Sequence, residues 1–251
     1  MPATPHAGDP GQLRVRRAAD RGRAEHGWLH ARFTFSFAEY FDREHMHFHA
    51  LRVMNNDILE PGGGFPTHPH RDAEIFTYVI SGQLRHQDSM GNAATIEAGN
   101  LQYMSAGNGV RHSEFNPSRT APTELYQVWL LPAQAGGTPR YAEKPLGNRA
   151  APDALSFLFS PEGRDQSTAI RQHAEIHFGK LSAGRELSIP FRPDLPHAWL
   201  QLIDGLLEVP GYELNRADGL AVENRSTDLT VRATRDSEFL LFHLANFQPP
   251  T

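Results

Sequence analysis

GGGFPTHPHRDAEIFTYVISG (residues 62–82), DSMGN (88–92) and AGNLQYMSAGNGVRHSEFN (98–116) make up the stretch that decides the fold of this chain. Two pairs of potential metal ligands lie in it, His68 with His70 and His112 with Glu114, and one residue separates the members of each pair. Residues i and i+2 of an extended strand point to the same face, so each pair can direct both side chains to one point. The stretch therefore predicts β-strands that carry a metal held by four protein ligands.

The same strand-and-turn pattern continues on both sides of this stretch. From Leu13 onward, short apolar segments are separated by Gly, Pro, Asn and Asp, and long helical periodicity is absent. One short helix is expected at 38–42. Strands are expected at 49–55, 74–80, 83–87, 100–105, 125–131, 156–159, 175–180, 198–203, 220–223, 229–233 and 238–244. This pattern predicts an all-β fold of the sandwich or barrel type.

A segment rich in Gly, Pro and Ala, AQAGGTPRYAEKPLGNRAAPD (133–153), indicates a boundary between two domains. The expected division has five parts: a flexible lead at 1–12, an N-terminal domain with the metal site at 13–133, a linker at 134–153, a C-terminal domain without metal ligands at 154–247, and a tail at 248–251.

A weak internal repeat supports two copies of one β-fold. Gly62, Ile80-Ser81-Gly82 and Ala98-Gly99 have counterparts in Gly184, Ile203-Asp204-Gly205 and Asp218-Gly219. The ligands are not repeated, because the positions equivalent to His68 and His70 fall near Pro190 and Arg192. We therefore expect one metal site and one vestigial half.

Composition narrows the classes of function. The chain contains no cysteine, which excludes disulfides, thiolate metal sites and cysteine nucleophiles, so a metal site must use His and carboxylates. The formal charge of -5 and the pI near 6.3 provide no basic surface for direct nucleic-acid binding. No apolar run approaches the roughly 20 residues of a membrane helix, and the N-terminus has no apolar signal segment. We expect a cytoplasmic protein with a small-molecule partner and no membrane partner.

Three imidazoles and one carboxylate suit a divalent first-row metal and leave coordination positions open for O2 or a Lewis-acid reaction. Pro69 lacks an amide donor, which predicts an edge or mouth position for its strand. The alternative is that these are ordinary histidines, which is the usual interpretation of a lone His. Four ligand-type residues in two strand-spaced pairs favour the metal.

Other histidines offer weaker alternatives. His45, His47 and His49 would share one strand face, but a single strand cannot easily surround an ion. His86 and Asp88 resemble a catalytic dyad, although their neighbours are typical of a hairpin turn. His197 and His243 are isolated in the second half, which favours a structural role for both.

The spacing Gly62-x5-His68-x-His70-x3-Glu74-x7-Gly82, followed by Gly99-x5-Ser105-x-Gly107 and His112-x3-Asn116, resembles the two motifs of the cupin superfamily. THPHRDAEIFTYVISG, HQDSMGN and MSAGNGVRHSEFNPS are similar to the pirin family, and within it to the bacterial pirin-like quercetin 2,3-dioxygenases. The likeness extends to ADRGRAEHGWLHARFTFSFAEYFD and DSEFLLFHLA. Departures from a general cupin are Ser105 in place of Pro, two extra residues before His112, and a C-terminal domain without ligands, all compatible with the pirin pattern.

The resemblance implies a bicupin with two β-barrel or jelly-roll domains and one metal in the first. Its ligands would be His68, His70, His112 and Glu114, with Fe(II) expected and Ni, Mn, Cu, Co or Zn as alternatives. Many cupins use the first-motif glutamate, here Glu74, whose strand parity matches that of His68 and His70. We expect Glu74 to support the ligands from outside the coordination sphere.

The resemblance also implies a dioxygenase that cleaves flavonol-like aromatic substrates with O2. A carboxylate beside a cation can exchange its metal bond for a proton, so we expect Glu114 to be both a ligand and the catalytic base. We expect the chain to be a monomer. Two other functions are compatible with the same ligands: a non-catalytic, redox-responsive regulator with a protein partner, and a metal-dependent isomerase or hydrolase. Aromatic and apolar residues of the opening stretch are candidates for the pocket wall, namely Phe65, Phe76, Tyr103, Met104 and Phe115.

Overall fold

The computed structural model describes residues 11–146 and 150–249, and these form almost only β-strands. The expected all-β class is confirmed. The described residues divide into two compact units. The N-terminal unit comprises 21–146, 170–172 and 248–249, and the C-terminal unit comprises 11–20, 150–169 and 173–247.

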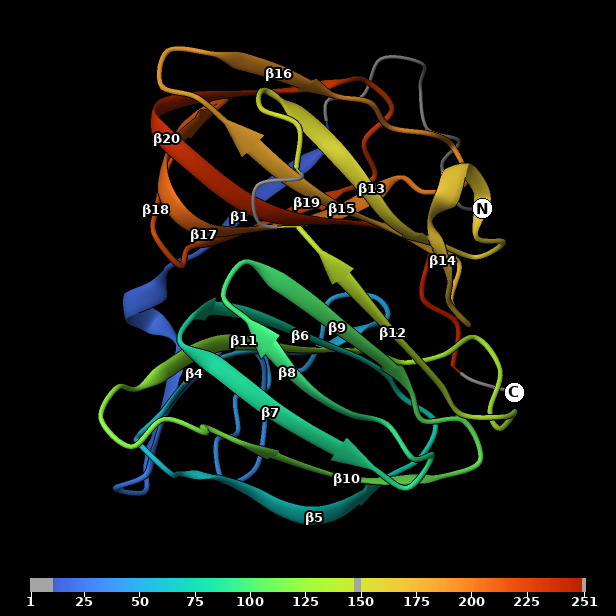
Figure 1. Cartoon of the computed structure of the whole chain (residues 1–251). Helices are drawn as coiled ribbons and strands as arrows, with labels where there is room; N and C mark the ends of the chain where they lie inside the picture. Colours follow the sequence, from blue (N-terminus) through green and yellow to red (C-terminus); the bar gives the residue numbers. More distant parts are fainter. Residues whose placement is uncertain (1–10, 147–149, 250–251) are drawn as a thin grey trace. The chain divides into compact units, whose positions relative to one another are not determined.

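Two antiparallel sheets build the N-terminal unit (Figure 1). The seven-stranded sheet has the order β12 (Arg140–Pro145), β9 (Asn100–Ser105), β6 (Glu74–Ser81), β11 (Thr123–Leu130), β4 (Leu51–Leu59), β3 (Leu29–Phe33) and β2 (Gly22–Glu25). The four-stranded sheet has the order β5 (Gly64–His70), β10 (Val110–Phe115), β7 (Gln83–Asp88) and β8 (Ala93–Glu97). Pro69 therefore lies on an edge strand, β5, as its missing amide donor predicts.

The core of this unit lies between the two sheets. Leu29, Leu59 and Val79 of the larger sheet share a buried cluster with Leu84 and Ile96 of the smaller one. Alternation of buried and partly buried residues along β3 shows why: one face of each strand is apolar and is removed from water by the opposite sheet. Both sheets stay open at their ends, so the unit is a jelly roll rather than a closed barrel.

A nine-stranded sheet forms the C-terminal unit. Its main path is β1 (Gln12–Arg16), β19 (Gly219–Glu223), β17 (His197–Val209), β20 (Leu229–Leu244), β15 (Ala174–Leu181), β13 (Ala154–Ser160) and β14 (Thr168–Ala169). In addition, β16 (Glu186–Ile189) pairs with β20, and β18 (Tyr212–Asn215) pairs with β17. The only helical segments in the described ranges are two short 3-10 turns, η1 (Ala18–Asp20) and η3 (Arg164–Gln166), and neither approaches the length of a membrane-spanning helix.

Three local expectations differ from the structure. Residues 38–42 form no helix, because Phe37 and Tyr40 bridge across a tight turn. The strands expected at 229–233 and 238–244 are one strand, β20, whose polar middle is accommodated by register shifts against β17. The segment expected as a linker contains β12, which pairs with β9, while β1 pairs with β19 and so joins the C-terminal unit.

The internal repeat is visible at two of its glycines. Gly82 follows β6, and Gly205 lies inside β17 where the register shifts. Both have positive φ, 76° and 101°, and a Cβ on either would approach other atoms closer than 3.0 Å, so only glycine fits these positions. The third repeat anchor differs, since Gly219 packs against the Trp199 ring and has no positive φ.

Candidate metal centre

Three histidines meet between the ends of β5 and β10. His68 lies opposite His112 in the register of these strands, and their Nε2 atoms are 3.0 Å apart. His70 completes the group, with its ring centroid 4.8 Å from those of both His68 and His112. One ligand atom from each of the three residues lies within 4.8 Å of the others. The structure thus brings together the histidines that the strand spacing predicts.

A backbone carbonyl sets the tautomer of His68. Its Nδ1 lies 2.8 Å from the Pro66 carbonyl oxygen. A carbonyl only accepts hydrogen bonds, so Nδ1 carries the proton and Nε2 presents a lone pair toward the other rings. A hydrogen bond at the remote nitrogen is the usual way in which a metal-ligating imidazole is oriented.

Burial keeps the other two imidazoles neutral. Desolvation, followed by the neighbouring His68, lowers the pKa of His70 to about 4. Desolvation also lowers the pKa of His112 to about 2, with further contributions from His68 and His70. His112 is 2% exposed, and its Nδ1 has no hydrogen-bond partner among the described residues. Neutral imidazoles are the protonation state that metal binding requires.

Glu114 lies on the same strand as His112 and lines the same cavity as the three histidines. Its oxygens accept hydrogen bonds from Thr77 Oγ1 at 3.2 Å and from Gln127 Nε2 at 2.7 Å. Burial raises the pKa of Glu114 to about 7, against the lowering effect of these two hydrogen bonds. In this arrangement Glu114 groups with His86 and His112 rather than with His68 and His70.

Glu74 does not face the site. Its buried carboxylate accepts hydrogen bonds from Tyr103 at 2.5 Å, Ser105 at 2.6 Å and the Arg171 backbone at 3.1 Å. The parity argument fails because Asp72, with φ of 50°, interrupts the chain between β5 and β6, which belong to different sheets. The expectation that Glu74 supports the ligands is wrong in this structure, and Ser105 instead helps to hold that carboxylate.

His86 lies beside the three histidines, although the sequence favoured a role in a hairpin turn. It is fully buried, and its ring centroid is 5.3 Å from that of His112. Gln102 Nε2 lies 3.0 Å from His86 Nδ1, and His86 Nε2 lies 3.2 Å from Asp88 Oδ2. Asp88 also accepts the backbone amides of Met90 and Asn92, so it serves both the hairpin turn and the buried histidine. The signal was available in the spacing of His86 and Asp88.

A cavity of about 260 Å³ opens beside the histidines. Phe65 is the one member of the expected pocket wall that lines it. The other four expected residues do not line it. Phe76 and Tyr103 are buried with their ring centroids 5.1 Å apart, Met104 belongs to another apolar cluster, and Phe115 is 36% exposed. The remaining wall comes from strands of the larger sheet and from the loop between β3 and β4: Phe37, Val53, Asn55, Asp57, Gln127 and Trp129.

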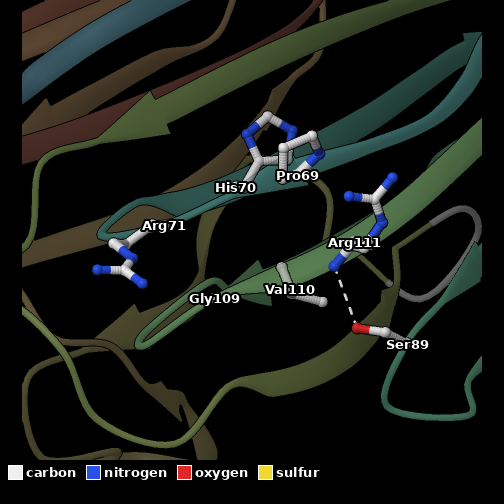
Figure 2. Close-up of a pocket in the computed structure, with 7 residues that line it drawn as sticks. All are labelled: Pro69, His70, Arg71, Ser89, Gly109, Val110 and Arg111. Carbon is white, nitrogen blue, oxygen red and sulfur yellow. Dashed lines mark hydrogen bonds between the residues drawn. The ribbon is translucent and has the colours of Figure 1, made fainter.

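A second, wider cavity of about 330 Å³ also contacts His70 (Figure 2). Figure 2 shows Arg71 and Arg111 on either side of Gly109 and Val110, with Pro69 above them. The Arg111 amide donates a hydrogen bond to Ser89 Oγ at 3.1 Å. This cavity adds two positive charges next to a proposed ligand.

Within either unit, the described residues bring three ligand atoms within 4.8 Å only in the group of His68, His70 and His112 and in the adjoining group of His86, His112 and Glu114. Residues 45–49 precede β4 and lie outside the named strands, so His45, His47 and His49 do not share a strand face. His197 hydrogen-bonds Asn246, in line with a structural role. The C-terminal unit contains a cavity of about 210 Å³ lined by Pro190 and Arg192, at the positions where the repeat predicts the missing ligands. Its described residues do not bring three ligand atoms within 4.8 Å of one another.

The residues of the N-terminal cavity fit a divalent metal. Three imidazoles converge, with the Nε2 atoms of His68 and His112 facing each other, and a carboxylate is within the same cavity. His68, His70 and His112 would hold the ion, and Glu114 is available as the fourth ligand.

Comparisons with known proteins agree with this geometry. Residues 12–130 match the Pirin family model, and residues 157–244 match the quercetinase C-terminal cupin domain. The chain is 43% identical over 230 residues to a quercetin 2,3-dioxygenase of Escherichia coli K12, covering 92% of this chain and 97% of that protein. It is 38% identical over 227 residues to a pirin-like protein of Caulobacter vibrioides, covering 89% and 96%.

Solved structures show the same likeness. The crystal structure of YhhW from Escherichia coli has a TM-score of 0.88 and 41% identity, covering 96% of this chain and 99% of that one. The crystal structure of bacterial pirin YhhW in complex with nickel(II) has a TM-score of 0.87 and 41% identity, covering 96% and 100%.

Proposed function

The chain belongs to the pirin family, and on that premise we propose that it is a metal-dependent dioxygenase that cleaves flavonol-like aromatic substrates with O2. The metal is one divalent ion per chain, for which Fe(II) is our first choice and nickel(II) is supported by the related YhhW complex. The coordinating residues are His68, His70, His112 and Glu114.

One observation carries the proposal: three convergent imidazoles and a carboxylate open onto a cavity whose walls are partly apolar. Phe37, Phe65 and Trp129 supply flat apolar surface for an aromatic ring. His70 packs edge-on against Trp129, with ring centroids 4.8 Å apart, so the metal position and the aromatic surface are adjacent. Such a cavity suits an aromatic ligand that carries metal-binding oxygens.

Glu114 is the residue suited to move a proton. A pKa near 7 places its carboxylate between acid and base at neutral pH, which favours transfer from a substrate hydroxyl. Thr77 and Gln127 hold both carboxylate oxygens and so fix the acceptor in place. When bound, the metal would supply Lewis acidity and open positions for substrate and O2. Ring cleavage in the manner of a quercetinase is the expected outcome.

The test measures oxygen consumption and loss of flavonol absorbance after reconstitution with Fe(II) or Ni(II), with quercetin as substrate. We expect turnover by the wild type and none by His70→Ala. His243→Ala is the matched control because it removes a buried imidazole from the C-terminal unit. A metal-loaded wild type that consumes no O2 with quercetin or related phenols would falsify the dioxygenase proposal.

Elemental analysis of the same proteins, purified without added metal, tests the ligands separately. His70→Ala should lose stoichiometric metal, with affinity lower by about tenfold or more, while His243→Ala should keep it. Full metal retention by His70→Ala would overturn the ligand assignment.

A further inference from the structure

The wall of the metal cavity that belongs to the larger sheet is rich in hydrogen-bond acceptors. Asn55 on β4 lies directly opposite Gln127 on β11 in the strand register, and Asp57 follows two residues after Asn55 on the same strand. All three side chains line the cavity. The histidines come from β5 and β10 of the smaller sheet, so a molecule bound at the metal lies between the two sets of residues.

These acceptors are buried and incompletely paired. Asn55, Asp57 and Gln127 are 3%, 4% and 8% exposed. Each has one side-chain oxygen, Oδ1 in Asn55 and Asp57 and Oε1 in Gln127, with no hydrogen-bond partner among the described residues. Leaving buried acceptors unpaired costs free energy, and proteins rarely tolerate several together without a partner that completes them.

The orientation of the Gln127 amide is defined by its neighbour. Its Nε2 donates a hydrogen bond to Glu114 Oε2 at 2.7 Å. The amide nitrogen thus faces Glu114, and Oε1 is left as an acceptor without a partner among the described residues. The same hydrogen bond links the acceptor wall to the residue that we propose as the base.

We propose that the amide oxygens of Asn55 and Gln127 form a hydroxyl-recognition wall, which accepts hydrogen bonds from free hydroxyl groups on the part of an aromatic substrate that lies away from the metal. Asp57 borders this wall, where burial and the nearby Glu114 raise the pKa of its carboxyl to about 7. This inference rests on the proposed function, which places the metal-binding oxygens of the substrate at the histidines. A polyhydroxylated aromatic compound completes the wall with its donors. A compound without these hydroxyls, or with carboxylates in their place, leaves the oxygens unpaired or repelled, so the wall selects against it.

The experiment compares binding of two probes to the metal-loaded full chain by calorimetry in the absence of oxygen. Quercetin carries hydroxyls on its outer rings, and 3-hydroxyflavone keeps the metal-binding hydroxyl and carbonyl but lacks the others. We expect wild type to bind quercetin roughly tenfold more tightly than 3-hydroxyflavone, as one or two added hydrogen bonds would give.

Variants separate the acceptor from the shape of the cavity. Asn55→Leu should lower the preference for quercetin by about three- to tenfold, with little change for 3-hydroxyflavone. Asn55→Asp keeps an acceptor and should keep the preference. Val53→Ala, on the same face of the same strand, should alter both affinities alike. Metal content and thermal unfolding of each variant establish that the site is intact.

The proposal is overturned if wild type binds both probes equally or neither, or if Asn55→Leu weakens both to the same extent. Equal binding would mean that water completes the acceptors. Because binding is measured without oxygen, a wild type that discriminates between the probes but shows no turnover would sink the dioxygenase proposal and leave this one standing. Turnover of both flavonols with equal affinity would do the reverse.

Discussion

At the scale of single residues, Glu114 has the environment of a proton acceptor. It is 3% exposed, and burial raises its pKa to about 7 while Thr77 and Gln127 hold its two oxygens. This combination arises because β10 carries Glu114 into the buried space between the two sheets.

Glu114→Gln should therefore lower kcat by about 10²-fold or more, since an amide cannot take the proton. Because Glu114 is also a proposed metal ligand, the two proteins are compared at equal metal content, measured by elemental analysis. At equal metal content, quercetin binding without oxygen should stay within about threefold of wild type, because glutamine keeps the shape of the cavity. Glu124→Gln on β11, whose side chain is not part of the cavity wall, is the control and should retain activity. An unchanged kcat in Glu114→Gln would remove the base from the mechanism.

The sequence predicted the convergence of the histidines because period-two spacing is preserved within one strand. His68 and His70 both belong to β5, and His112 lies opposite His68 across the sheet. The same period-two argument was wrong for Glu74, because the chain passes from one sheet to the other between residue 70 and residue 74. The acceptors Asn55 and Gln127 could not be anticipated, since their pairing depends on the long-range register of β4 and β11.

At the scale of elements, two glycines show how much of the strand pattern could be predicted. Gly82, which follows β6, and Gly205, which lies at a register shift inside β17, were both anchors of the repeat, and both have positive φ. The sequence could not predict that β20 is one uninterrupted strand, because its polar stretch at 234–237 has the composition of a turn. Register shifts opposite Asp204 and Leu206 let that stretch remain paired with β17.

Gly205→Ala should destabilise the chain more than Gly184→Ala. Both glycines have positive φ, 101° and 80°, so each substitution costs about 1–2 kcal/mol of backbone energy. A Cβ at Gly205 would also lie 2.2 Å from Ser237 Oγ and 2.4 Å from the Asp236 carbonyl oxygen. A Cβ at Gly184 would have no atom of the described residues within 4 Å. Denaturant unfolding monitored by fluorescence gives the comparison, and equal losses for the two variants would contradict it.

At the scale of the whole molecule, two units of one fold contain different cavities. The N-terminal cavity gathers metal ligands, and the C-terminal one contains Arg192 and Arg164, which both pair with Glu175 at 2.9 Å and 2.5 Å. The vestigial half was predictable from the absence of ligands at Pro190 and Arg192. Its ion pairs were not, because Arg164 and Glu175 lie outside the repeated motif.

His243 makes the stability of the C-terminal unit depend on pH. Desolvation lowers its pKa to about 3, with His177 and Arg192 contributing, against an ordinary value near 6.5. The unfolded chain therefore binds the proton first, so this stability is present above pH 6.5 and is lost progressively as the pH falls toward 3. By linkage the loss is about 2 to 3 kcal/mol at pH 4.5.

His243→Phe should correspondingly reduce the fall in unfolding free energy between pH 7 and pH 4.5 by about 2 to 3 kcal/mol. Phe191→Leu is the matched control, because it alters the ring that lies 5.2 Å from His243 without removing a titrating group. If wild type and His243→Phe lose stability equally on acidification, the buried imidazole is not the cause.

The position of β5 has a consequence for how long a metal stays bound. It is an edge strand, it hydrogen-bonds to β10, and Pro66 and Pro69 give it no amide donor at two positions. Two of the three histidines therefore sit on the part of the sheet that can separate from its neighbour with the fewest broken bonds. The residence time of a bound metal would then depend on how often β5 separates from β10. The affinity for the metal would depend on the ligands themselves. A metal held at this position would leave through the opening of β5, without unfolding of the rest of the unit.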